Sequence, residues 1–318
     1  MLSSAYSREQ IDQFLDYIQL PKKYHHAPPS YDLLKTLHTY MLAAVPYENL
    51  AIHYNPAHAV ELDPQHLFRK IVLNRRGRGG YCMENGILYN HMLVGLGFDA
   101  YTVGARTRLR AGGVPQGDFP GWVHIVSIVE VDGQQYHVDI AFGGDCATRP
   151  LPLVHGDSDE LVYQNLGAQQ IRLVRDWVPT QRKRTSASKL WIYEYRNGPD
   201  RPWNPFYCFA LVEFMPNDWD VINVFASSSP KSWQTKTVIA IKFLRRTRDD
   251  GDDEGREEIY GKRMLVDHVV KENLGGKTAV IYECKNEADR VAALEKYFDL
   301  RLTEEEGNAI RGWSTALP

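Results

Sequence analysis

No apolar run in the 318 residues approaches the roughly 20 residues that a membrane-spanning helix requires. Charged residues such as Arg8, Asp12 and Asp16 interrupt the first 20 residues, which excludes the apolar core of a secretory signal. Neither sign of charge dominates, because 37 Lys and Arg stand against 40 Asp and Glu and give a net charge of −3. We therefore expect a cytoplasmic protein that binds neither membranes nor nucleic acid.

Cysteine is also scarce. The four cysteines stand at positions 82, 146, 208 and 284, and no two have the CxxC spacing of a zinc site or a redox motif. In a reducing compartment such scattered thiols are usually free. We therefore expect no metal site, and the question becomes whether one thiol is a nucleophile.

Up to residue 97 the sequence predicts a helical bundle. Ser7 with Gln10 forms a capping-box pattern, Ser30 is a candidate N-cap, and Asp63 precedes a proline at a first helical position. Apolar residues recur at helical spacing after each of these signals. We expect this bundle, residues 1–97, to carry Cys82 on its last helix.

After residue 97 the pattern changes to short apolar runs separated by turn residues. Residues 98–200 predict an antiparallel β-barrel, 201–234 an irregular connection between domains, and 235–318 an α/β lid. From Arg245 to Glu258, 11 of 14 residues are charged, which favours a solvated hairpin tip over an electrostatic docking loop. The predicted fold class is α+β.

Cys82 follows a Gly-Gly turn at the start of a predicted helix. The free N–H groups and the positive dipole end of a helix lower a thiol pKa, and three arginines between 75 and 78 could add positive field. The alternative is a small buried apolar residue, the commoner role of a cysteine near a helix start. Cys82 alone therefore does not decide between the two.

A hairpin signal brings two further groups together. A two-residue loop at Asp132-Gly133 pairs Val126 with Asp139, and His124 lies two residues from Val126 on the same face. His124 and Asp139 are then diagonal neighbours, roughly 7–8 Å apart at the backbone, so their side chains can hydrogen bond. A register slip of two residues keeps them on one face.

A thiol, an imidazole and a carboxylate form the set of nucleophile, base and orienting group that covalent acyl transfer requires. Simpler interpretations remain open at this point. His124 could be a hydrogen-bonded strand histidine, and Asp139 could satisfy the backbone of a turn. His137 with Asp139 suggests a metal pair but lacks a convincing third ligand.

Several segments resemble motifs of the arylamine N-acetyltransferases. The segment Arg78-Gly-Gly-Tyr-Cys82-Met-Glu84 resembles the family's active-site motif. Three further segments match the family in the same order along the chain. They are Val45-Pro-Tyr-Glu-Asn-Leu50, His124 followed by Tyr136-His-Val-Asp139-Ile-Ala-Phe142-Gly143, and Asn223-Val-Phe-Ala-Ser-Ser-Ser-Pro230.

The resemblance implies a helical bundle, a β-barrel and an α/β lid around a transglutaminase- or papain-like cysteine core. It implies a Cys82–His124–Asp139 triad that moves an acyl group by a ping-pong mechanism from acyl-CoA to a small arylamine, arylhydrazine or arylhydroxylamine. Phe142 falls where the family places an aromatic residue of the arylamine pocket, and we assign Tyr81 to substrate binding as well. The oligomeric state stays open.

Acyl-CoA, the expected cosubstrate, carries phosphates that require backbone N–H groups or cations. Ser228, Ser229 and Lys231 lie in the segment that resembles the family's connection to the lid, and we expect them at the CoA entrance. Gly143 and Gly144 could let the pantetheine arm pass close to the backbone. The alternative for the serines is an ordinary turn.

The sequence departs from the family pattern at two positions. Gly86 stands where the family usually has Asn, with Asn85 one place early, and Ala141 replaces the usual Gly before Phe142. Both departures affect substrate detail more than the reaction. The Met after Cys82 resembles fungal members, some of which prefer malonyl-CoA, so the donor is acetyl-CoA or malonyl-CoA.

Two other classes of protein compete with the transferase. A transglutaminase- or papain-like amidase would use the same Cys, His and Asp but would pass the acyl group to water or to a protein amine. A binding protein with a decayed site is the second rival, and the intact Cys82, His124 and Asp139 weigh against it.

Overall fold

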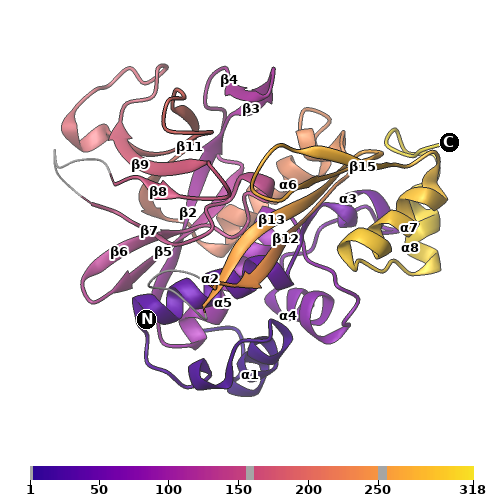
Figure 1. Ribbon diagram of the computed structural model, residues 1–318, viewed down its shortest axis with the longest axis horizontal. Coiled ribbons are helices and arrows are strands. Elements are labelled where there is room, and N and C mark those ends of the chain that lie inside the picture. Colours follow the sequence, from indigo (N-terminus) through magenta and orange to yellow (C-terminus); the bar gives the residue numbers. More distant parts are fainter. Residues whose placement is uncertain (1–2, 155–160, 250–255) are drawn as a thin grey trace.

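The computed structural model describes residues 3–154, 161–249 and 256–318. Helices come first along the chain, a curled antiparallel sheet follows, and a second sheet with two helices completes the fold (Figure 1). The helices are α1 (Arg8–Tyr17), α2 (Tyr31–Ala44), α3 (Leu50–Tyr54), α4 (Pro64–Phe68) and α5 (Cys82–Gly95). A π-helical turn, Arg69–Leu73, extends α4.

The predicted helix starts are confirmed. Ser7 and Gln10 form a complete capping box on α1. The Ser30 hydroxyl accepts from the Leu33 N–H at 3.2 Å, and the Asp63 carboxylate accepts from the His66 N–H at 2.8 Å. Each cap satisfies an N–H group that the first helical turn leaves without a partner.

The larger sheet has eight antiparallel strands in the order β7-β6-β5-β2-β11-β10-β9-β8. Their bounds are β2 (Asp99–Thr107), β5 (His124–Val131), β6 (Gln134–Val138), β7 (Leu151–Pro152), β8 (Tyr163–Gln164), β9 (Gln170–Asp176), β10 (Leu190–Arg196) and β11 (Asn204–Glu213). A short ribbon, β3 (Leu109–Ala111) with β4 (Val114–Gln116), stands apart. Within the described residues β7 and β8 are edges, so the expected barrel is instead a curled open sheet (Figure 1).

The expected irregular connection over 201–234 is wrong. Asn204–Glu213 forms β11 in the middle of the sheet, and Pro216–Ser228 forms helix α6. The run from Phe206 to Phe209 is fully or nearly fully buried, which is typical of a central strand. The prolines of this segment, including Pro205 near the start of β11 and Pro216 at the start of α6, gave it the composition of a loop.

The second sheet has the strand order β1-β12-β13-β14-β15. Its strands are β1 (Tyr47–Glu48), β12 (Ile239–Thr247), β13 (Glu257–Val266), β14 (Val269–Asn273) and β15 (Ala279–Glu283), and helices α7 (Glu287–Phe298) and α8 (Glu304–Ala309) follow. Because β1 comes from the N-terminal part of the chain, the helical bundle and the lid share this sheet.

The charged stretch between 245 and 258 includes the end of β12 and the start of β13. Its described ends form cross-strand ion pairs, Arg245 with Glu257 at 3.1 Å and Arg246 with Glu258 at 2.8 Å. Residues 250–255, where the sequence predicts the hairpin tip, lie outside the described residues. No helix in the described part of the chain has both the length and the apolar character needed to cross a membrane.

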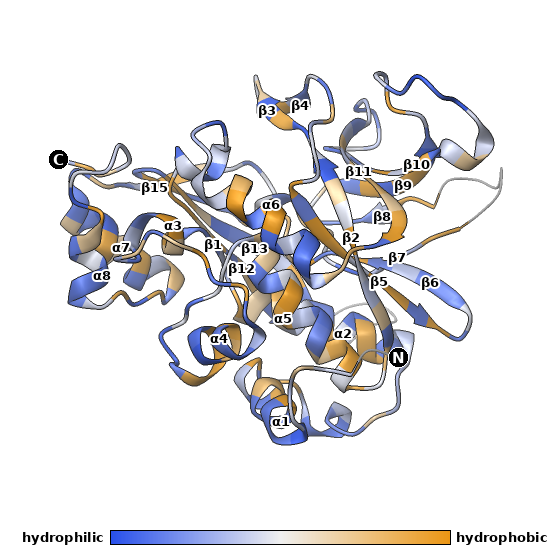
Figure 2. Ribbon diagram, turned by 180° about the vertical axis from the view of Figure 1, so that it is seen from behind, coloured by the Kyte–Doolittle hydropathy of each residue, from blue (hydrophilic) through white to orange (hydrophobic). Residues whose placement is uncertain are grey.

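Helix α5 lies at the centre of the molecule. Figure 2 shows it surrounded by α2, α4 and the strands β2 and β5. Most of its side chains are buried, including Met83, Leu88, Met92 and Leu93. A helix that is buried nearly all round holds its first residue in a fixed place, and the first residue of α5 is Cys82.

Candidate active site

Two glycines hold the turn before Cys82 against the strand β1. A Cβ on Gly79 would lie 1.9 Å from the Pro46 carbonyl oxygen, and Gly80 forms a β-bridge to Tyr47. No side chain fits at Gly79, because the backbone of the turn packs directly on the backbone before β1. The Gly-Gly pair therefore fixes the entry of α5 and the position of its thiol.

A buried ionic cluster of Glu48, Lys70, Arg78 and Glu84 supports the same turn. The Lys70 Nζ lies 2.6 Å from Glu84 Oε1, and the Arg78 Nε lies 2.8 Å from Glu48 Oε1. Glu84 also accepts from the Tyr81 N–H at 3.1 Å. Burial raises the pKa of Glu84, whereas Glu48, although equally buried, has a lowered pKa because Arg78 and Lys70 stabilise its charge.

The arginines before Cys82 do not act on the thiol as expected. Arg78 pairs with Glu48 and with Glu306 at 2.8 Å each, and Arg76 also pairs with Glu306. Arg75 is exposed. The carboxylates compensate these charges, so the expected positive field at Cys82 is wrong.

The Cys82 side chain is 4% exposed, with Sγ 3.2 Å from Met83 Sδ and 3.6 Å from the Val123 carbonyl oxygen. Burial raises the pKa of the Cys82 thiol and the charge of Asp139 raises it further, although the backbone N–H of Met83 opposes them. The expected net lowering by the helix start is therefore wrong. A thiol in this environment needs a base to accept its proton.

His124, the first residue of β5, supplies an imidazole beside Val123. Its Nε2 lies 2.8 Å from Oδ2 of Asp139, and both side chains are buried. The predicted hairpin register is confirmed, since Val131 pairs with Gln134 and Ser127 with Val138. With Nε2 donating to the carboxylate, Nδ1 keeps the lone pair that a base requires.

Asp139 is held by three donors. Oδ2 accepts from His124 and, at 2.9 Å, from the Tyr207 hydroxyl, while Oδ1 accepts from the Ala141 N–H at 2.9 Å. Burial by itself would raise the pKa of Asp139, but the neighbouring His124, through its charge and its hydrogen bond, and the Ala141 N–H bring it below its usual value. The carboxylate therefore stays charged and can orient the imidazole.

His137 is not a metal ligand in this arrangement. Its Nε2 lies 2.6 Å from the Tyr207 hydroxyl. Because that hydroxyl donates its own hydrogen bond to Asp139, the His137 Nε2–H group must be the donor to the Tyr207 oxygen. Burial lowers the pKa of His137 to about 4, which keeps the ring neutral. Across the described residues, no three His, Cys, Asp or Glu side chains are grouped to hold a metal ion.

The structure places the predicted binding residues in two groups. The Phe142 ring packs on His124 with centroids 5.0 Å apart, and Gly143 and Gly144 follow it in a 3₁₀ turn, η3 (Gly143–Asp145). Ser228 and Ser229 lie at the C-terminal end of α6. The N–H group of Ser229 bonds within that helix, and the free carbonyls of a helix C-terminus disfavour phosphate.

Tyr81 is fully buried, and its hydroxyl donates to Asn223 Oδ1 on α6. This hydrogen bond connects the residue before α5 to α6. Lys231 is exposed beyond the end of that helix.

The two departures from the family pattern have physical consequences. A Cβ on Gly86 would lie 2.5 Å from Cγ2 of Ile125, so α5 and β5 pack too closely here for an asparagine. Asn85 instead donates to the Pro46 carbonyl at 3.1 Å. Ala141 is buried and contributes its N–H to Asp139, a bond that a glycine would make equally well.

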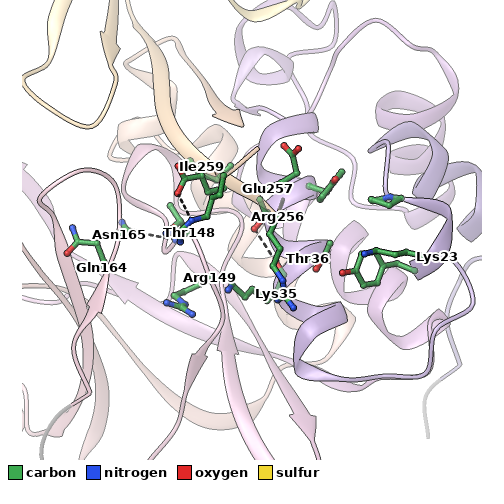
Figure 3. Close-up of a pocket in the computed structure, with 16 residues that line it drawn as sticks. Lys23, Lys35, Thr36, Thr148, Arg149, Gln164, Asn165, Arg256, Glu257 and Ile259 are labelled. Atoms are coloured by element: carbon green, nitrogen blue, oxygen red, sulfur yellow. Dashed lines mark hydrogen bonds and ion pairs between the residues drawn. The ribbon is translucent and has the colours of Figure 1, made fainter. Parts of the chain in front are cut away.

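A cavity of about 250 Å³ lies between α2, the residues after η3 and the start of β13 (Figure 3). Its charged lining consists of Lys23, Lys35, Arg149, Arg248, Arg256, Glu257 and Glu258. Cys82, His124 and Asp139 are not among the described residues that line it. This cavity is therefore not the place where the thiol meets its substrate.

Sequence reasoning missed three residues that support the site. Tyr207 lies on β11, which was expected to be a loop, and Lys70 lies in the π-helical turn. Lys262 on β13 contacts the Gly144 carbonyl. The aromatic run around Tyr207 was a usable signal for a buried strand, whereas nothing local marks Lys70 or Lys262 as part of a site.

Comparison with known proteins agrees with the motifs and the fold. A family model described as N-acetyltransferase matches residues 30–306. The chain is 31% identical to the N-malonyltransferase FDB2 of Fusarium pseudograminearum, over 96% of this chain and 92% of that protein. An arylamine N-acetyltransferase / N-hydroxyarylamine O-acetyltransferase of Salmonella typhimurium is 27% identical, over 64% of this chain and 63% of that protein.

Solved structures share the fold. The arylamine N-acetyltransferase of Mycobacterium abscessus matches with a TM-score of 0.76 at 20% identity, covering 98% of both chains. The Mycobacterium marinum enzyme in complex with CoA matches with a TM-score of 0.71 at 24% identity, covering 94% of this chain and 98% of that one. The fold and the motifs define an acyltransferase of the N-acetyltransferase type. The chain belongs to the arylamine N-acetyltransferase family.

Proposed function

We propose that this protein transfers an acyl group from acyl-CoA to a small arylamine, arylhydrazine or arylhydroxylamine through a thioester on Cys82. The observation that carries the proposal is the buried His124–Asp139 pair, in which Nδ1 of His124 is free of the carboxylate. The Cys82 Sγ lies 3.6 Å from the carbonyl oxygen of Val123, the residue before His124. Family membership supports the use of acyl-CoA, and one relative of known structure was solved in complex with CoA.

In the first half-reaction Nδ1 of His124 accepts the Cys82 proton, and the sulfur attacks the thioester carbonyl carbon of acyl-CoA. The bond between that carbon and the CoA sulfur breaks, and the CoA thiolate takes the proton from His124. Asp139 stabilises the imidazolium that exists between these steps. The products are free CoA and acyl-Cys82.

In the second half-reaction the amine nitrogen attacks the carbonyl carbon of acyl-Cys82. His124 accepts a proton from that nitrogen and returns it to the Cys82 sulfur as the carbon–sulfur bond breaks. Phe142, whose ring packs on His124, forms one wall of the acceptor site. Tyr81, which the sequence assigned to substrate binding, supports that region from within, because it is fully buried and its hydroxyl donates to Asn223.

The donor is acetyl-CoA or malonyl-CoA. Similarity to a fungal protein named N-malonyltransferase, over nearly the whole chain, favours malonyl-CoA. We place the CoA entrance along Gly143 and Gly144, with the exposed Lys231 at its rim. Ser228 and Ser229, which the sequence also assigned to it, are left out because the carbonyls at the C-terminal end of α6 disfavour phosphate. A Lys231→Glu variant should then raise the KM for acyl-CoA and leave the KM for the arylamine unchanged; movement of the arylamine KM alone would remove Lys231 from the entrance.

Mass spectrometry after mixing with acyl-CoA tests the proposal directly. We expect one added acyl group, on the peptide that contains Cys82, and its loss when an arylamine is added. The Cys82→Ala variant should take up no acyl group, whereas Cys284→Ala, which removes a thiol in the lid, should behave as the wild type. Release of the acyl group to water at the same rate with and without amine would identify a cysteine hydrolase instead.

A further inference from the structure

Lys262 is a buried lysine beside the active-site loop. It is 8% exposed, and its Nζ donates to the Gly144 carbonyl. Within the described parts of the chain, no Asp or Glu lies at ion-pair distance from this ammonium. A buried charge without a counter-ion is costly, so such a site gains free energy when it binds an anion.

A continuous line of contacts joins Lys262 to the nucleophile. Tyr47 forms a β-bridge to Gly80, two residues before Cys82, and a Cβ on Gly143 would lie 3.8 Å from the Tyr47 ring. On the next residue, a Cβ on Gly144 would lie 3.7 Å from Lys262 Nζ. The glycine pair therefore lies between the Tyr47 ring and the Lys262 ammonium.

The strand register places these groups on one face of the lid sheet. Tyr47 pairs with Ile241 and Ile241 with Met264, while Lys262 stands two residues from Met264 on the same strand. Because side chains alternate along a strand, Met264 and Lys262 point to the same side. That side faces the loop after Asp139, since Met264 and Ile241 are also close to Gly144.

Lys262 is also within electrostatic reach of the catalytic region. Burial raises the pKa of Cys146 and the Asp139 charge raises it further, whereas the Lys262 ammonium lowers it. The charges of Asp139 and Lys262 therefore both act on the Cys146 thiol. Cys146 accepts from the Phe142 N–H at 2.9 Å, at the residue whose ring packs on His124.

We propose that Lys262 binds the terminal carboxylate of a malonyl-type acyl group and so selects that donor over acetyl-CoA. An ammonium has three N–H donors, and the Gly144 carbonyl takes one of them, so two are available to a carboxylate. Acetyl-CoA has no charge at this end of the acyl group and gains nothing from Lys262. The inference rests on the acyl transfer proposed above, because it concerns the donor of that same site.

The decisive measurement is the ratio of kcat/KM for malonyl-CoA to kcat/KM for acetyl-CoA, with one arylamine. The Lys262→Met variant keeps most of the aliphatic stem and removes the charge. We expect kcat/KM for malonyl-CoA to fall by about 10- to 100-fold, the range for loss of a charge-assisted hydrogen bond. With acetyl-CoA the change should stay within about threefold.

Lys242→Met is the matched control. Lys242 lies on the neighbouring strand β12, but its Nζ contacts the Phe298 carbonyl and Asp299, on the opposite side of the sheet. This variant should keep the wild-type ratio. If Lys262→Met does not fold, as judged by its melting temperature, Lys262→Gln supplies the same comparison.

A test on the wild type needs no substitution. The CoA thioester of malonic acid monoamide has the shape of malonyl-CoA without its charge, and we expect it to react about 10-fold or more slowly than malonyl-CoA. Equal rates for these two donors would overturn the assignment. An equal fall of kcat/KM for malonyl-CoA and for acetyl-CoA in Lys262→Met would also overturn it, because the lysine would then bind the CoA part that both donors share. Wild-type transfer from acetyl-CoA alone rejects only the inference, whereas no transfer from any acyl-CoA rejects the proposed function.

Discussion

The hydroxyl of Tyr207 donates to Oδ2 of Asp139 at 2.9 Å, the same oxygen that accepts from His124. Tyr207 comes from β11, whereas Asp139 follows β6, so the sheet brings together two residues that are 68 positions apart. With Ala141 binding the other oxygen, the carboxylate cannot rotate away from the imidazole. Tyr207 therefore fixes the carboxylate that orients the proposed base, His124.

Replacing Asp139 should cost far more activity than replacing Tyr207. Asp139→Asn removes the charge that stabilises the imidazolium, and the corresponding change in a serine-protease triad costs about 10⁴-fold. We expect a loss of several orders of magnitude in kcat/KM. Tyr207→Phe removes one hydrogen bond and should cost roughly 10-fold. Steady-state kinetics with circular dichroism checks both, and near-normal turnover of Asp139→Asn would give Asp139 a purely structural role.

Thiol labelling should separate Cys82 from the other cysteines. Burial raises the pKa of Cys208 to about 12, and it also raises the pKa of Cys146 and of Cys284. The proposed base, His124, follows Val123, whose carbonyl oxygen lies 3.6 Å from the Cys82 sulfur, so iodoacetamide should modify Cys82 much faster near pH 7.5. His124→Ala should remove most of this difference. Equal labelling of all four thiols in the wild type, followed by peptide mass spectrometry, would argue against an activated Cys82.

The local features of the site could be predicted from the sequence. The hairpin at Asp132-Gly133 fixed the partners of β5 and β6, and the glycine pair before Cys82 marked the start of α5. These features depend on residues close together in the chain. The strand β11 was missed because prolines such as Pro202 and Pro205 are typical of loops, although the apolar run that follows them is buried.

Contacts between distant segments could not be predicted in the same way. Glu48, Lys70 and Glu84 come from three elements, and their pairing depends on how those elements pack. The same holds for Lys262, which reaches Gly144 across 118 residues. The predicted lowering of the Cys82 pKa failed for a related reason, since burial is a property of the whole fold and outweighs the local helix start.

The cluster around Lys70 gives a stability prediction. Lys70→Met leaves Glu48 and Glu84 buried beside one cation fewer, and we expect a loss of about 3–5 kcal/mol in the free energy of unfolding. Adding Glu84→Gln removes the excess charge and should recover part of that loss. Lys22→Met, which breaks an exposed pair with Asp16, should cost less than about 1 kcal/mol. Urea unfolding measures all three, and equal effects of Lys70→Met and Lys22→Met would contradict the buried cluster.

Gly86 should be intolerant of any side chain. A Cβ there would lie 2.5 Å from Ile125 Cγ2, so Gly86→Ala or Gly86→Asn should destabilise the protein by about 1–3 kcal/mol. Ile125→Ala removes the clashing atom, and in the double variant Gly86→Ala with Ile125→Ala the two costs should not add. Simple additivity in a double-mutant cycle would show that α5 and β5 do not meet at these residues.

His38 makes the stability of the protein depend on pH. Its Nε2 donates to the Ala147 carbonyl at 2.8 Å, and burial lowers its pKa to about 4, although that hydrogen bond and Asp139 oppose the shift and Arg149 adds to it. As the pH falls, His38 of the unfolded chain binds a proton near pH 6.5, whereas His38 of the folded protein does so only at a lower pH. The stability that the neutral ring provides is therefore complete above about pH 6.5 and falls as the pH drops toward 4.

Between about pH 7.5 and pH 5 this single histidine should account for about 2 kcal/mol of lost unfolding free energy. His38→Gln keeps an N–H donor for Ala147 but cannot titrate, so the variant should lose about 2 kcal/mol less than the wild type over the same range. His268→Gln, which replaces an exposed imidazole, controls for the loss of a titratable group as such. Urea unfolding at both pH values measures the difference. Because His53 and His137 are also buried with pKa values near 4, each variant should still lose some stability as the pH falls. If the unfolding free energy of His38→Gln depended on pH as strongly as that of the wild type, His38 would have to take up its proton in the folded state.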